Sequence, residues 1–207
     1  MSDGVGTPAA APKASNRDIL RYLAPMLAQA LLVVAVFAGV GAACGWLWFT
    51  VWTPPSGGVQ DGVWLYEDFA SIGDVFDATA LYVVVGVGVG ALLGVLTAVL
   101  VRRAELLMLV AVLAGSALAA WLSYRVGLHL SAPDPTTLAA GLPDGTQLDG
   151  NLELPGRSPF IAWPLGALVG LAVTYFLTTT VASTQQRDEY DPEWLQRMGP
   201  GGRPGLG

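Results

Sequence analysis

The uninterrupted apolar run from Leu81 to Val101 constrains the fold of this chain more than any other stretch. It carries no charged side chain and is long enough for one helical crossing of a bilayer, which takes about 20 residues. Within it, Gly86, Gly90 and Gly94 recur every four residues, and four helical residues advance by one turn plus about 40°. The three glycines therefore share one face of the predicted helix, and such a small-residue stripe favours close packing of another helix.

The alternation of valine and glycine from Val85 to Gly90 also has the period of a β-strand. A helix is the better interpretation, because an open strand in lipid would leave its backbone N–H and C=O groups unpaired. Glycine in a helix costs about 1 kcal/mol relative to alanine. Its repetition here therefore indicates a compensating contact between helices.

Composition supports a membrane protein. Of the 207 residues, 53% are hydrophobic and only 13% are charged, which argues against an ordinary soluble domain. The net charge of −6 argues against nucleic acid as a partner, since such binding needs a clustered basic face. The single cysteine, Cys44, excludes an intramolecular disulfide and a cysteine-based metal cluster.

The predicted fold class is an all-α membrane protein with four transmembrane helices in two hairpins. The predicted spans are residues 26–52, 79–101, 106–124 and 160–181, within a transmembrane domain of residues 24–183. Because few residues separate the second and third spans, we expect a tight hairpin between them. Small residues at four-residue spacing recur along the spans and predict these helix-packing positions: Gly86, Gly90, Gly94, Gly115, Gly166 and Gly170.

The segments between the spans predict two tails and a small extracytoplasmic cap. Residues 1–23 and 184–207 are expected to be solvated cytoplasmic tails, the first of them disordered. The outer loops, residues 53–77 and 125–158, carry signals for short β-hairpins. Asp61-Gly62 ahead of an apolar run predicts a turn entering a strand, and Asp149-Gly150 predicts a second hairpin.

The basic residues favour an orientation with both termini in the cytoplasm. Eight of the ten lysines and arginines lie in the tails or at Arg102-Arg103, and only Arg125 and Arg157 lie in the outer loops. The positive-inside rule then predicts a multi-pass protein with both termini on the cytoplasmic side and both outer loops on the other. Aromatic residues gather at the opposite ends of the spans, as in an interfacial belt: Trp46, Trp48, Trp52, Tyr82, Trp121, Tyr124, Phe160 and Trp163.

Two short matches suggest an internal repeat. Residues 35–39 (AVFAG) match 111–115 (AVLAG), and residues 90–94 (GALLG) match 166–170 (GALVG), both at an offset of 76. A duplicated helical hairpin would place a pseudo-twofold axis along the membrane normal. Chance similarity between apolar helices is the alternative.

Several features occur in a familiar order. They are the Arg102-Arg103 pair, the Trp121 to Gly127 exit from the third span, the loop end Leu152 to Pro155, and the fourth-span entry Ala162 to Leu168. This order, over roughly residues 30–180, resembles a family of uncharacterised actinobacterial membrane proteins that is defined as a domain of unknown function. The resemblance implies four spans and a plasma-membrane location, and it supplies no activity.

Residues suited to chemistry are sparse. The spans carry no ionisable side chain at mid-membrane depth, so we expect no catalytic, cofactor or metal site. Arg125, Trp163 and Trp64 are the candidates for contact with lipid or a partner. Arg125 lies where a helix end meets the headgroups and could pair with a lipid phosphate or with Asp77, and simple snorkelling is the alternative.

Two functional hypotheses follow. The first is a non-enzymatic accessory or scaffold protein that packs through small-residue faces against a membrane-protein partner or a second copy of itself. The second is a small-solute transporter or channel built from two repeated hairpins. The lack of a polar span face favours the first.

Overall fold

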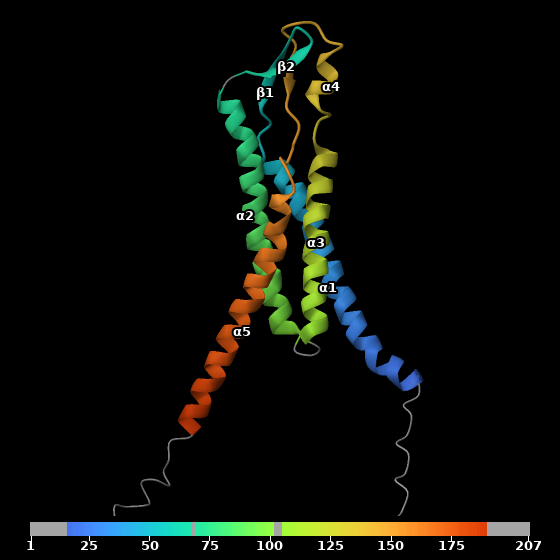
Figure 1. Cartoon of the computed structure of the whole chain (residues 1–207), viewed down its shortest axis with the longest axis vertical. Coiled ribbons are helices and arrows are strands. Elements are labelled where there is room, and N and C mark those ends of the chain that lie inside the picture. The colour runs from blue at the N-terminus through green and yellow to red at the C-terminus, as the bar shows by residue number, and fades with distance from the viewer. Residues whose placement is uncertain (1–15, 68, 102–104, 190–207) are drawn as a thin grey trace, which may run out of the picture.

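The computed structural model of the chain describes residues 16–67, 69–101 and 105–189. It is mostly helical, with a small sheet at one end, called here the cap end (Figure 1). The long helices are α1 (Asn16–Val51), α2 (Phe69–Leu100), α3 (Glu105–Leu130) and α5 (Ala162–Glu189). All four are long and apolar enough to cross a membrane.

Helix bounds differ from the prediction mainly at the cap end. The third helix was expected to end at residue 124, but α3 continues to Leu130, because Arg125 and His129 interrupt the apolar pattern without breaking the helix. Residues 69–77, predicted as loop, form the start of α2. Both corrections have one cause: helices extend beyond the apolar stretch that a bilayer requires.

The helices also extend into the predicted tails. Residues 16–23 form the start of α1, and residues 184–189 form the end of α5, so these parts of the predicted tails are helical. The rest of both tails and the Arg102-Arg103 pair lie outside the described residues.

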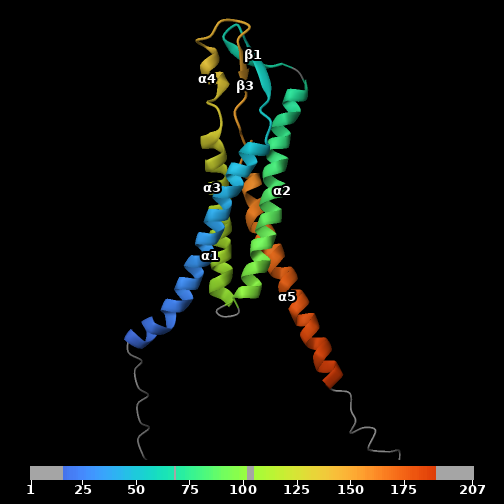
Figure 2. The same cartoon turned by 180° about the vertical axis from the view of Figure 1, so that it is seen from behind.

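The helices pack in two pairs, and the two helices of each pair run in the same direction. α1 packs chiefly on α3, and α2 packs chiefly on α5, each pair running parallel (Figures 1 and 2). The expected tight packing of α2 on α3 is wrong, since these successive helices share few contacts. The reason is that the glycine-bearing face of α2 meets the small-residue face of α5 instead.

Backbone contact dominates the α2–α5 interface. A Cβ atom added at Gly90 would lie 2.6 Å from the Trp163 carbonyl oxygen, and one at Gly86 would lie 2.8 Å from the Trp163 ring. Gly94 lies against the Ala167 backbone. Gly88, by contrast, has nothing within 4 Å of such a Cβ and lies on the open side of α2. Only the stripe of Gly86, Gly90 and Gly94 faces α5.

The α2–α5 contacts are reciprocal at the repeat offset. Gly94 of α2 contacts Ala167 of α5, and Gly170 of α5 contacts Ala91 of α2. The two contacts are equivalent in the repeat, because positions 94 and 91 correspond to positions 170 and 167 at the offset of 76. In the same way, Gly90 meets Trp163 and Gly166 meets Val87. A residue pair that exchanges partners in this way is the mark of a twofold interface.

The α1–α3 interface lacks this reciprocity. Gly41 and Gly45 of α1 lie against the backbones of Ala119 and Ser123. Gly115 of α3 packs on Phe37, but its counterpart at the repeat offset, Gly39, has nothing within 4 Å of an added Cβ. The pseudo-symmetry is therefore preserved in one helix pair and lost in the other.

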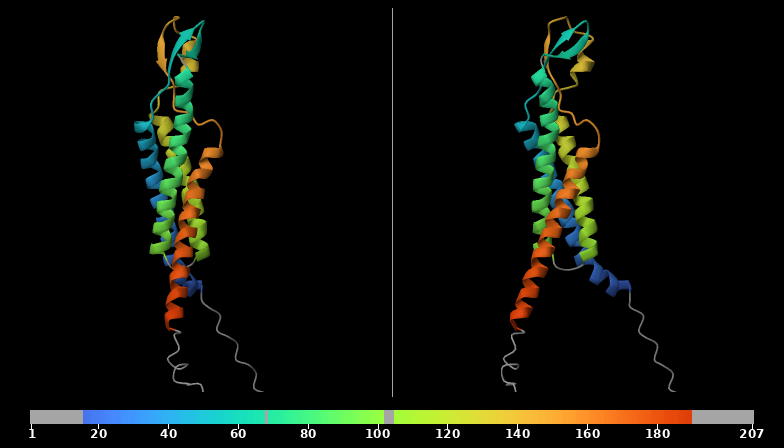
Figure 3. Two further views of the ribbon diagram at one scale, coloured as in Figure 1. Left: turned by 90° about the vertical axis from the view of Figure 1, so that its left-hand side faces the viewer. Right: turned by 60° about the vertical axis from the view of Figure 1, so that its left-hand side comes forward.

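The ends of α1 and α5 opposite the cap diverge from the bundle. Figures 1 and 3 show both helices leaning away from α2 and α3 there. Beyond Leu171 and Thr174, the described residues of α5 as far as Thr180 are exposed. The tight helix contacts are thus concentrated in the half of the bundle nearer the cap.

The cap contains a three-stranded antiparallel sheet in the order β2-β1-β3, built from β1 (Ser56–Gln60), β2 (Val63–Tyr66) and β3 (Gln147–Asp149). Asp61 and Gly62 form the β1–β2 turn with φ of 52° and 73°, the conformation of a type I′ turn, so the first hairpin prediction is confirmed.

The second predicted hairpin, at Asp149-Gly150, is wrong. β3 pairs with β1 rather than with the residues that follow it, and the Gly150 N–H donates to the Pro55 carbonyl oxygen at 2.7 Å. The free second edge of β1 offers β3 a long-range partner that local turn residues do not reveal. Two short helices complete this end, α4 (Pro135–Ala139) and the 3-10 helix η1 (Ser158–Ile161).

We expect Gly90→Ala to lower thermal stability while Gly88→Ala on the same helix does not. The added methyl at position 90 must displace the α5 backbone, which costs about 1–3 kcal/mol, whereas position 88 is open. Thermal unfolding of both variants in detergent checks this. Equal melting temperatures would show that the α2–α5 contact does not support the bundle.

Candidate functional site

Aromatic side chains form a buried cluster at the cap end of the bundle. Trp48 and Tyr82 are almost fully buried, with ring centroids 5.1 Å apart, and Tyr82 and Tyr124 both contact Phe160. The Trp48 indole donates to the Ala78 carbonyl at 2.8 Å, and the Tyr82 hydroxyl donates to the Ala120 carbonyl at 2.7 Å. The cluster thereby joins α1, α2, α3 and η1.

This cluster corrects the predicted aromatic belt. Trp48, Tyr82 and Trp163 lie inside the bundle, and Trp163 is 0% exposed. Trp46 and Trp121 are exposed and do have the placement that an interfacial residue needs. Periodicity alone could not separate the two groups, because both lie near the same ends of their helices.

Trp64 is buried beneath the cap sheet. It packs with Val59 and Ala139, and its indole donates to the Leu148 carbonyl oxygen at 3.0 Å. This bond links β2 to the segment that contains β3, across the central strand β1. Trp64 and Trp163 are thus both buried, which does not favour the predicted contact of these side chains with lipid or a partner.

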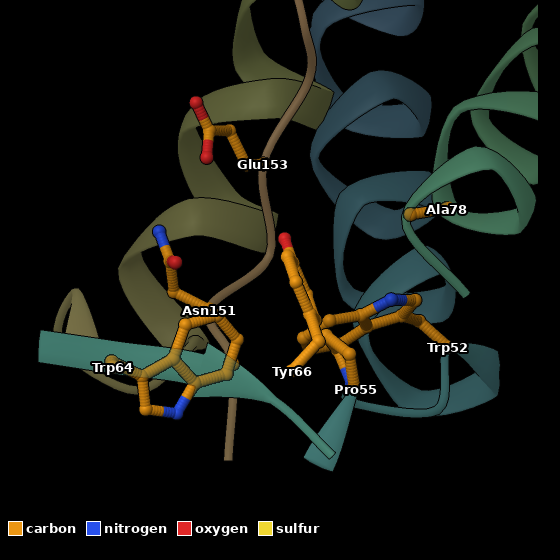
Figure 4. A pocket seen from close by; sticks show the side chains of 8 residues that line it. Trp52, Pro55, Trp64, Tyr66, Ala78, Asn151 and Glu153 are labelled. Atoms are coloured by element: carbon orange, nitrogen blue, oxygen red, sulfur yellow. The ribbon is translucent and has the colours of Figure 1, made fainter. Parts of the chain in front are cut away.

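A small cavity lies between the cap and the helix ends (Figure 4). Its volume of about 30 Å³ is enough for one or two water molecules. In Figure 4 the Tyr66 hydroxyl points upward, toward the level of Glu153. The Trp52 ring nitrogen lies below Ala78 in the same view. The lining residues are Trp52, Pro55, Trp64, Tyr66, Ala78, Gly150, Asn151 and Glu153.

Trp52 also borders a larger, open groove between the cap ends of α1 and α2. The groove has a volume of about 400 Å³ and is lined by Val51, Trp52, Thr53, Asp77, Ala80, Leu81 and Val84. It exists because α1 and α2 contact each other little. Among the described residues that line it, Asp77 alone is charged, and its side chain is exposed.

Two polar groups of this groove have no partner among the described residues. The Trp52 indole Nε1 is buried and makes no hydrogen bond. The Asp77 carboxylate makes no ion pair with a basic side chain in the described part of the chain. Of these two groups, the exposed Asp77 carboxylate is accessible from the groove, whereas the indole N–H is enclosed.

Arg125 lies elsewhere on the surface. Its guanidinium carbon is 5.7 Å from the centroid of the exposed Trp121 ring, a cation–π arrangement within α3. The structure does not pair Arg125 with Asp77. Arg125 keeps an exposed position, from which contact with a lipid phosphate remains a prediction.

The predicted helix-packing glycines all lie at helix contacts. Gly86, Gly90 and Gly94 face α5, Gly166 and Gly170 face α2, and Gly115 faces α1. Two buried hydroxyls inside the bundle, those of Thr97 and Ser116, donate to carbonyls of their own helices, so neither points to a polar path.

Metal binding finds no geometric support. Among the described residues, no three His, Cys, Asp or Glu side chains lie close enough together to hold an ion. His129 is exposed on α3. The groove and the small cavity are two places in the described part of the chain with room for a ligand.

Comparison with protein families, curated proteins and solved structures finds no match to this chain. The family resemblance of the sequence therefore stays a prediction. What the protein does must be argued from its own geometry.

Sequence reasoning missed the groove, although one signal pointed to it. Asp77 is the last acid before the apolar run of α2, and Trp52-Thr53 directly follows the apolar run of α1. Both positions are at the same end of antiparallel helices. What could not be foreseen is that α1 and α2 stand apart and leave a groove between them.

We expect Trp48→Phe to destabilise the protein, and Trp46→Phe to leave it nearly unchanged. The first change removes a buried hydrogen bond and packing at the junction of the helices, at a cost of about 1–3 kcal/mol. Trp46 is 57% exposed and makes no such contact. Thermal unfolding in detergent compares them. A similar loss in both variants would mean that the indole bond to Ala78 is dispensable.

Proposed function

We propose that this chain is an integral protein of the plasma membrane, with both termini in the cytoplasm, that acts by contact as a non-enzymatic accessory or scaffold protein. The observation that carries the proposal is the apolar, backbone-packed interior of the bundle. Among the described residues, the fully buried side chains are almost all apolar, and the α2–α5 contact leaves no space along its axis.

The cap supplies a surface for such contact. β2 is an edge strand of the sheet, and its Val63, Leu65 and Tyr66 side chains are exposed. Exposed apolar side chains on an edge strand are a common means of joining another chain. In the proposed orientation this surface lies outside the bilayer, so contact with lipid does not explain why its apolar side chains are exposed.

The cap is also held firmly to the helices. The Gly150 N–H donates to the Pro55 carbonyl oxygen. The Leu152 N–H donates to the hydroxyl oxygen of Ser131, directly after α3, at 2.7 Å. Leu152 itself is fully buried in the bundle cluster. A partner bound to the cap would therefore be held in a defined position relative to the helices.

A transporter or channel is the second candidate, and the reciprocal α2–α5 contacts favour it. Parallel repeats related by an axis along the membrane normal occur in transporters with duplicated halves. The lack of a polar lining among the described interior residues weighs against this candidate.

Site-specific photo-crosslinking in native membranes tests the contact proposal. A crosslinker placed at Leu65 on the exposed face of β2 should capture a reproducible partner, identified by mass spectrometry. The same crosslinker at Leu142, an exposed leucine elsewhere on the cap, serves as the control. Saturable solute uptake by liposomes containing only the purified protein would favour the transporter instead.

Reporter fusions test the orientation. A fusion after Arg103 should give a cytoplasmic signal, and a fusion at Gly141, between α4 and β3, should give an exported one. The expected contrast follows from the distribution of lysine and arginine. The opposite pattern of signals would discard the proposed topology.

A further inference from the structure

The groove between α1 and α2 lies at the depth of the lipid headgroups if the helices cross a bilayer. The apolar segment of α1 ends at Val51, two residues before Thr53, and that of α2 begins at Phe76, directly before Asp77. The polar lining residues are thus at the boundary of the hydrocarbon, and the apolar ones, Ala80, Leu81 and Val84, follow at increasing depth.

The shape of the groove suits an amphiphile. From Ala80 to Val84, α2 advances by about 6 Å, so this wall can accompany the first carbons of an acyl chain. Val51 faces the same space from α1. A ligand with a polar head and an apolar tail would place both ends in matching surroundings.

The charge of the groove selects the headgroup. The Asp77 carboxylate has no cationic partner among the described residues, so it attracts an ammonium group and repels an anionic headgroup. The Trp52 indole Nε1 is enclosed by the protein, so Asp77 is the polar group that selects the headgroup. Among membrane amphiphiles, a zwitterionic phospholipid carries the cation that this carboxylate attracts.

A primary ammonium fits better than a trimethylammonium group. It carries N–H donors and can form a charge-assisted hydrogen bond with a carboxylate, whereas a quaternary group has no donor. The small cavity behind Trp52, at about 30 Å³, is too small to take a quaternary group as an aromatic cage.

We propose that the groove between α1 and α2 binds a phospholipid with a primary amine headgroup, such as phosphatidylethanolamine. The ammonium group pairs with Asp77, and an acyl chain follows Ala80, Leu81 and Val84. This site rests on the membrane location included in the proposed function. It does not depend on any partner of the cap.

Competition between lipids tests the site on the full-length protein in detergent. Equal amounts of phosphatidylethanolamine, phosphatidylcholine and phosphatidylglycerol are added, and bound lipid is counted by native mass spectrometry. The unmodified protein should retain phosphatidylethanolamine over both others. Asp77→Asn should lower the ratio of bound phosphatidylethanolamine to phosphatidylglycerol about fivefold, the effect of losing a modest ion pair.

Two further variants make the result specific. Asp61→Asn removes an exposed carboxylate from the cap turn, where asparagine accepts the positive φ of 52°, and should leave the ratio unchanged. Ala80→Phe fills the groove while keeping the Asp77 carboxylate, and it should also abolish the preference. Thermal unfolding of each variant identifies any that fail to fold, and the remaining variant then decides.

The site is refuted if the unmodified protein retains the three lipids equally, or prefers phosphatidylcholine or phosphatidylglycerol. It is equally refuted if the folded Asp77→Asn and Ala80→Phe variants keep the preference. Each of these outcomes leaves crosslinking at Leu65 unaffected, so failure of the lipid site and failure of the contact proposal are distinguishable.

Discussion

Close approach of the α2 and α5 backbones is the contact on which the arrangement of the helices depends. Gly90 and Gly94 bring α2 within reach of the Trp163 and Ala167 backbones, and Gly166 returns the contact from α5. Without side chains between them, the two helices cross at short distance, and dispersion contacts accumulate along the crossing. The α1–α3 pair then packs beside this crossing, and the aromatic cluster of Trp48 and Tyr82 closes the end nearer the cap.

Much of this fold could be predicted from the sequence, because length, hydropathy and small-residue spacing act locally. The four apolar helices and the Asp61-Gly62 hairpin belong to this group. The choice of packing partner could not be predicted in this way. Whether the small-residue face of α2 points toward α3 or toward α5 depends on the arrangement of the whole bundle. The pairing of β3 with β1 likewise joins segments far apart in the chain.

The candidate site illustrates the same limit. Asp77 and Trp52 are ordinary boundary residues in the sequence, and their importance comes from the gap that opens between α1 and α2. Within the repeat, α3–α5 is the counterpart of α1–α2, and that pair is more closely packed. The groove thus marks the place where two related halves differ. Duplication can supply a framework, while divergence of one copy supplies a site.

The divergence of α5 from the bundle has a mechanical consequence. From Ala167, where the helix crosses α2, to Glu189, α5 extends by about 33 Å. A rotation of only a few degrees at the crossing would displace the distant end by about 2 Å, since displacement grows with the length of the arm. The 3-10 helix η1 lies on the short arm of this lever and the last described turns of α5 lie on the long one, so a small adjustment at the cap end of α5 would reach its opposite end enlarged.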